Sequence, residues 1–77
     1  MDTIGQRLRT ARERRFMTQE ALSQQTGITE ATISRIENDR GEKRPRLSTV
    51  KRLADALGAD AAWILLGEDT DMGKAAA

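Results

Sequence analysis

Cysteine, histidine and tyrosine are absent from this 77-residue sequence, and proline, tryptophan and phenylalanine each occur once. Without cysteine and histidine, a disulfide framework and a Cys/His zinc site are excluded, and we expect no metal or other cofactor. No apolar run approaches the roughly 20 residues that a membrane-spanning helix needs, and the first residues show no signal-peptide pattern. These absences predict one small soluble domain in the cytoplasm.

Catalytic patterns are missing as well. Ser/His/Asp and Cys/His arrangements need histidine, and no glycine-rich phosphate-binding loop is present. Carboxylates such as Asp69 and Asp71 fall in a segment that we expect to be flexible, and they have no evident catalytic partner. We therefore expect that the chain is not an enzyme.

Charge is distributed unevenly along the chain. The overall net charge is only +1, with 13 basic and 12 acidic residues. Residues 40–52, however, contain six basic residues and one acidic residue, a net charge of +5, whereas residues 53–77 carry −4. A concentrated basic segment attracts polyanions such as nucleic acid, although a solvated loop is the simpler alternative.

Helix-forming residues dominate, and polar turns recur at short intervals. We predict an all-α fold, a compact bundle of five short helices at about residues 3–15, 18–25, 29–37, 48–57 and 60–66. Thr3, Thr18, Thr29, Ser48 and Asp60 are the expected N-caps of the five helices. Leu47 is expected on the apolar, inward face of the fourth helix. The predicted domain covers residues 1–67, and residues 68–77 are expected to form a flexible tail.

The second and third predicted helices form the most informative unit. They are separated by three residues with Gly27 in the middle, where glycine can take the left-handed conformation of a tight corner. Leu22 and Ile33 are spaced to meet where the two helices cross, and Ile36 continues the inward face. This spacing is typical of a helix-turn-helix, whose second helix enters the major groove of DNA.

Six short segments carry a further signal when they are taken in order. They are residues 18–22 (TQEAL), 27–29 (GIT), 33–38 (ISRIEN), 43–46 (KRPR), 56–58 (ALG) and 63–67 (WILLG). Together they resemble the Cro and repressor proteins of lambdoid phages, also called XRE-like proteins, over about residues 4–67. The resemblance implies a lambda-repressor-like DNA-binding domain. Phe16 departs from the family, which usually has glycine at this position.

The resemblance also implies roles for individual residues. The family's recognition helix reads base edges, and the matching residues here are Glu30, Ala31, Thr32 and Arg35. Contacts to the DNA backbone are implied for Gln19, Thr29, Asn38, Lys43, Arg44 and Arg46. Arg12 and Glu37 match a structural ion pair between the first helix and the end of the recognition helix. Trp63 falls in a region that serves the core or the dimer contact.

Side-chain chemistry agrees with the base-reading roles and leaves alternatives open. Arg35 can donate two hydrogen bonds to O6 and N7 of guanine, worth about 1–3 kcal/mol of discrimination. A phosphate contact or a solvated surface arginine is the alternative. Glu30 can accept from cytosine or can repel wrong sequences, and Ala31 and Thr32 each offer a methyl group to thymine or simply fill surface.

The leading interpretation is a transcriptional repressor that binds a palindromic operator as a homodimer, in the cytoplasm at the nucleoid. Two-fold symmetry is expected because one short helix reads only a few base pairs, so specificity needs two half-sites about one DNA turn apart. One alternative is an antitoxin that holds a toxin and binds its own operator, with residues 68–77 folding on the toxin. Another is a helical interaction module without DNA binding.

Overall fold

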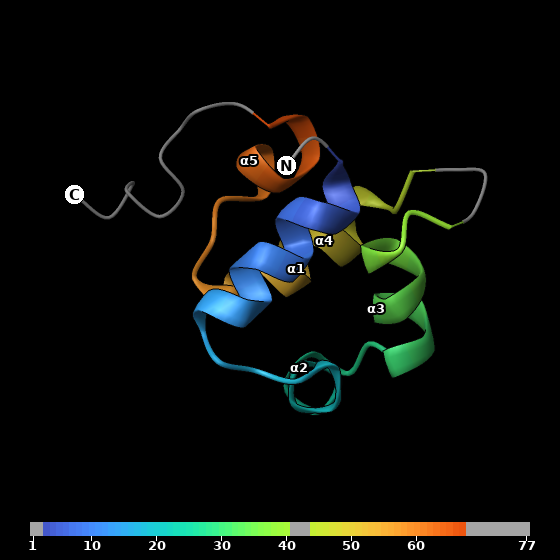
Figure 1. Cartoon of the computed structure of the whole chain (residues 1–77), viewed down its shortest axis with the longest axis vertical. Coiled ribbons are helices and arrows are strands. Elements are labelled where there is room, and N and C mark those ends of the chain that lie inside the picture. Colours follow the sequence, from blue (N-terminus) through green and yellow to red (C-terminus); the bar gives the residue numbers. More distant parts are fainter. Residues whose placement is uncertain (1–2, 41–43, 68–77) are drawn as a thin grey trace.

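The computed structural model describes residues 3–40 and 44–67, which form five α-helices (Figure 1). The helices are α1 (Ile4–Arg14), α2 (Gln19–Thr26), α3 (Glu30–Glu37), α4 (Leu47–Leu57) and α5 (Ala61–Leu66). The predicted all-α bundle is confirmed, and each helix boundary differs from the expected one by no more than one residue. Lys43 and the predicted tail at residues 68–77 lie outside the described residues. None of the helices within the described ranges is long and apolar enough to cross a membrane.

Side-chain caps begin four of the five helices. Each cap oxygen accepts a hydrogen bond from a backbone N–H of the first turn, at distances of 2.8–3.2 Å. Three are hydroxyls and one is a carboxylate, at the positions that the sequence suggested: Thr3, Thr18, Thr29 and Asp60. The starts of these helices are therefore encoded locally.

The expected cap of the fourth helix is wrong. Helix α4 begins at Leu47, and its N-cap residue is Arg46, whose side chain makes no capping hydrogen bond. The carbonyl of Arg46 already accepts the N–H of Val50 at 3.0 Å, so the first turn forms one residue before Ser48. The early start also leaves Leu47, expected on the buried face, 59% exposed.

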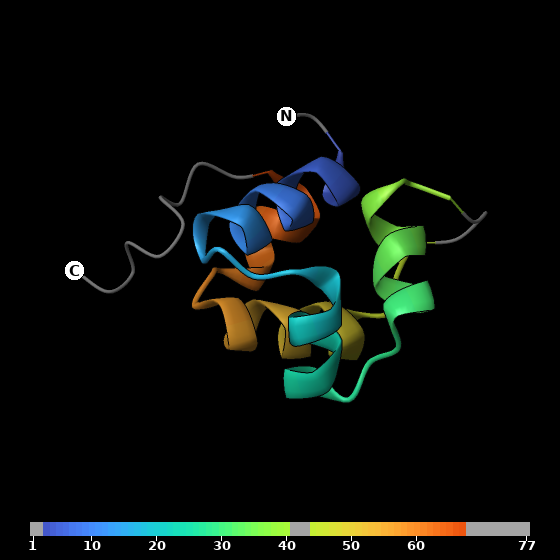
Figure 2. The ribbon, with the colours of Figure 1, turned by 60° about the horizontal axis from the view of Figure 1, so that its bottom comes forward.

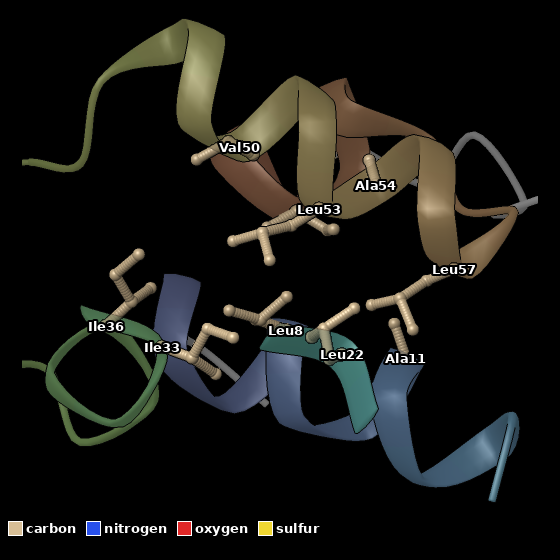
Figure 3. Close-up of a cluster of buried hydrophobic side chains, with 10 residues drawn as sticks. Leu8, Ala11, Leu22, Ile33, Ile36, Val50, Leu53, Ala54 and Leu57 are labelled. Atoms are coloured by element: carbon tan, nitrogen blue, oxygen red, sulfur yellow. The ribbon is translucent and has the colours of Figure 1, made fainter. Parts of the chain in front are cut away.

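The core lies between α1, α2 and α3 on one side and α4 and α5 on the other (Figure 3). Helix α1 packs against α3, α4 and α5, while α2 packs against α3 and α4. Trp63 is half-buried and packs against this core. The buried apolar side chains are Leu8, Ala11, Leu22, Ile33, Ile36, Val50, Leu53, Ala54, Leu57 and Ile64.

Phe16, in the turn between α1 and α2, has an unfavourable conformation and little packing. Its φ angle is 55°, in the left-handed region that side chains with a Cβ rarely adopt, and its side chain is 96% exposed. The turn is held by the Phe16 N–H, which donates to the Glu13 carbonyl at 2.9 Å. The backbone thus has the shape of a glycine turn although the residue is phenylalanine.

We expect Phe16→Gly to stabilise the domain by about 0.5–1 kcal/mol, because relief of the left-handed strain exceeds the extra chain entropy of glycine. For a domain of this size the melting temperature should rise by about 2–8 °C, measured by circular dichroism. Phe16→Ala is the matched control, since it removes the ring but keeps the Cβ. An equal gain from both variants would assign the effect to the exposed ring instead of the backbone.

Candidate nucleic-acid interface

Helices α2 and α3 are joined by a three-residue turn. Gly27 has a φ angle of 79°, as predicted, and its N–H donates to the Ser23 carbonyl at 2.8 Å. The Thr26 hydroxyl donates to the Leu22 carbonyl and accepts from the Ile28 N–H, which closes the corner. Because α2 extends to Thr26, Gly27 is the first residue of the turn and not its middle residue.

Helix α3 has one buried and one exposed face. Ile33 and Ile36 are 0% and 9% exposed and point into the core (Figure 3). In two views of the molecule, α3 lies at the edge of the bundle, far from α5 (Figures 1 and 2). The four residues for which base contacts were predicted are all exposed: Glu30, Ala31, Thr32 and Arg35. The two isoleucines therefore hold α3 so that these side chains face solvent.

A buried ionic network links α3 to the first two helices. Arg12 donates from Nε to Glu37 Oε2 at 2.7 Å and from Nη2 to Glu37 Oε1 at 3.0 Å, and the side chains are only 12% and 3% exposed. Gln19 Nε2 donates to the same Oε1 at 3.0 Å, and Arg12 Nη1 donates to the Met17 carbonyl at 2.7 Å. The hydrogen bond to Glu37 is the main cause of a raised pKa of Arg12, so the guanidinium stays charged. One carboxylate thus joins α1, α2 and α3.

Several residues predicted to bind the DNA backbone already have partners within the protein. Gln19 donates to Glu37, as described above, and Asn38 Nδ2 donates to both the carbonyl and the hydroxyl of Ser34. Thr29 caps α3, and its hydroxyl also donates to the Thr32 hydroxyl. These intramolecular hydrogen bonds fix the orientation of the Asn38 amide and of the Thr29 hydroxyl.

Arg44 has an intramolecular partner that the sequence did not suggest. Its Nη2 donates to the Leu65 carbonyl at 3.0 Å, at the C-terminal end of α5, where a positive charge is favourable. The side chain is exposed, and a guanidinium has five N–H donors, so other donors remain available for a phosphate. Arg44 therefore connects the basic segment to α5.

A basic hollow of about 870 Å³ lies beside the exposed face of α3. It is lined by residues from α1, from α3, from the segment that follows α3 and from the start of α4. Four arginines and one aspartate give it a positive balance. The lining residues are Ile4, Thr32, Arg35, Ile36, Asp39, Arg40, Arg44, Pro45, Arg46 and Thr49. The fold thus brings two predicted base-reading residues and two predicted backbone-binding residues to the same surface.

Two charged residues of the basic hollow were not among the predicted site residues. Arg40 is exposed, and its N–H donates to the Arg35 carbonyl at 2.9 Å, so it closes the C-terminal end of α3. Its place in the basic segment was the signal that could have identified it. Asp39 is the carboxylate among the lining residues, and no local pattern marked it.

Comparison with known proteins identifies the family. A model of a helix-turn-helix domain matches residues 3–63, most of the chain. The chain belongs to this helix-turn-helix family. The predicted resemblance to phage repressors is confirmed by the relatives that follow, which are named as transcription regulators.

Two curated relatives of this helix-turn-helix domain come from Bacillus and one of its phages. The transcriptional repressor RghR of Bacillus subtilis is 45% identical over 58 residues, which cover 74% of this chain and 42% of the relative. The immunity repressor of Bacillus phage phi105 is 37% identical over 68 residues, 88% of this chain and 45% of the relative. The chain therefore spans less than half the length of either relative.

A solved structure shares the fold of the helix-turn-helix domain. The P22 c2 repressor, solved in complex with a synthetic operator, superposes with a TM-score of 0.76 and is 26% identical. The match covers 88% of this chain and 100% of that one. The lambda-repressor-like fold class is thus confirmed.

Proposed function

We propose that this helix-turn-helix domain binds DNA sequence-specifically and acts as a transcriptional repressor in the cytoplasm, at the nucleoid. The observation that carries the proposal is the orientation of α3, with Ile33 and Ile36 buried and the four predicted base-reading residues exposed beside a basic hollow. The relatives named as repressors and the operator complex of the P22 repressor support the same function.

In the proposed complex α3 enters the major groove. Arg35 would donate to guanine, Glu30 would accept from cytosine, and the methyl groups of Ala31 and Thr32 would pack against thymine. The arginines of the basic hollow would lie against the phosphates of the adjacent strand, which positions the domain without reading sequence.

The proposed active form is a homodimer on a two-fold symmetric operator. Helix α3 has only eight residues and can read few base pairs, so two copies are needed for useful specificity. Selection of bound duplexes from a random DNA pool tests the whole proposal. We expect a palindromic site with half-sites about 34–36 Å apart along the helix axis. A pool without enrichment after several rounds would refute sequence-specific binding.

Arg35→Ala and Arg46→Ala should separate base reading from phosphate binding. We expect Arg35→Ala to cost about 1–3 kcal/mol on the selected site and to relax the choice at one base pair. Arg46→Ala should weaken binding to selected and scrambled duplexes alike. It should also reduce the slope of the logarithm of affinity against the logarithm of salt concentration by about one unit. Fluorescence anisotropy titrations at several salt concentrations measure both effects. Identical behaviour of the two variants on both duplexes would contradict the assigned roles.

A further inference from the structure

Asp39, two residues beyond the end of α3, has an unusual backbone conformation. Its φ angle is 54°, in the left-handed region, and its N–H donates to the Ile36 carbonyl at 3.0 Å. Aspartate tolerates this region better than most residues with a Cβ, because its short side chain can form local hydrogen bonds. The turn carries the side chain of Asp39 to the start of α1.

The carboxylate of Asp39 acts as a second cap for α1. Its Oδ2 accepts from the Thr3 hydroxyl at 2.8 Å, and its Oδ1 accepts from the Gly5 N–H at 3.1 Å. Thr3 in turn accepts from the Gln6 N–H, so both oxygens serve the first turn of α1. A negative charge at this helix end is favourable, because the free N–H groups there carry partial positive charge.

Gly5 brings the two backbones into direct contact at the same place. A Cβ at this position would lie 2.4 Å from the Ile36 carbonyl oxygen and 2.5 Å from that of Glu37. Both atoms are backbone, so any side chain here would push the last turn of α3 away from α1. The end of α3 therefore packs directly against the start of α1, and the hydrogen bonds of Asp39 stabilise this contact.

From this geometry we infer that Asp39 is a positioning residue for DNA recognition, which rests on the proposed function. The Arg12–Glu37 pair holds the last residue of α3 against the second half of α1, and Asp39 holds the turn that follows α3 against the start of α1. The two contacts together fix how the exposed face of α3 is presented. Asp39 also lines the basic hollow with four arginines, where its charge repels phosphates. Its two effects on DNA binding are therefore opposite in sign.

Asp39→Gly and Asp39→Asn test the inference on the selected operator site and on a scrambled duplex. Glycine removes the contacts to α1 and accepts the left-handed backbone, whereas asparagine keeps that backbone and one acceptor oxygen. Both variants should bind the scrambled duplex about twofold more tightly, since one repelling charge is gone. The ratio of operator to scrambled affinity should fall about fivefold for Asp39→Gly, the factor that corresponds to the loss of one helix cap, and less for Asp39→Asn. Asp55→Asn, an exposed α4 carboxylate outside the hollow lining, controls for net charge and should keep the ratio.

Two outcomes would overturn the inference. An unchanged ratio with tighter binding to both duplexes would show that Asp39 acts through its charge alone. A proportional loss on both duplexes, together with a lower melting temperature, would show a purely structural role. A wild-type domain without sequence preference would instead refute the proposed function.

In that event the amide chemical shifts of the free protein still test whether Asp39 holds the end of α3 against the start of α1. Asp39→Gly should shift the amide signals of α3, and unchanged signals would exclude this contact.

Discussion

Replacing Ile33 with aspartate is expected to abolish folding of the domain. The side chain is 0% exposed and lies where α3 meets α1 and α2 in the core (Figure 3). The change loses about 1.5–3 kcal/mol of apolar burial and places an unpaired carboxylate in the core, which costs several kcal/mol more. A domain of this size has a total stability of only about 4–12 kcal/mol. Circular dichroism should therefore show little cooperative unfolding.

Thr32→Asp is the matched control for this prediction. The neighbouring position carries the same new charge on the exposed face, within the first turn of α3, where a carboxylate is tolerated. We expect this variant to melt close to the wild type and to lose DNA binding, because its negative charge would lie against the polyanionic DNA. A cooperative melt of Ile33→Asp near the wild-type temperature would contradict the placement of α3.

Arg12→Ala is expected to reduce stability by about 3–5 kcal/mol, the usual cost of leaving one member of a buried ion pair without its partner. Glu37, with a side chain only 3% exposed, would keep the hydrogen bond from the Gln19 amide but lose its charged partner. The hydrogen bond from Arg12 to the Met17 carbonyl, which fixes the turn before α2, would be lost as well. Urea denaturation followed by circular dichroism measures the loss. An exposed ion pair would contribute only about 0–1 kcal/mol, so a loss in that range would contradict the buried position of the Arg12–Glu37 pair.

The double variant Arg12→Met with Glu37→Met separates the charge from the packing. Apolar replacement of both members of a buried pair is often neutral, so this variant should regain most of the stability lost in Arg12→Ala. The wild-type pair should show no titration of Arg12 under ordinary conditions. Its raised pKa means that the stabilising charge is present at all lower pH values and is lost only in strongly alkaline solution.

Helix starts and the central turn could be predicted from the sequence because the groups that form them are close neighbours in the chain. The threonine caps accept hydrogen bonds from N–H groups three residues ahead. Gly27 adopts the left-handed conformation of the turn because it has no Cβ. Leu47 shows the limit of this approach. Its apolar character fitted the inward face of a helix, but it stands at the first position of α4 and is exposed.

The sequence by itself determined the five helices, the sharp corner between α2 and α3 and the outward face of α3, since spacing of apolar and capping residues acts over one or two turns. Only the tertiary structure decided which distant groups meet. Asp39 lies 36 positions from Thr3 and 34 positions from Gly5 in the sequence, yet it contacts both. Arg44 likewise contacts Leu65 at the end of α5, 21 positions away. Such contacts depend on how packed helices are oriented in space, and a local pattern of residues does not carry that information.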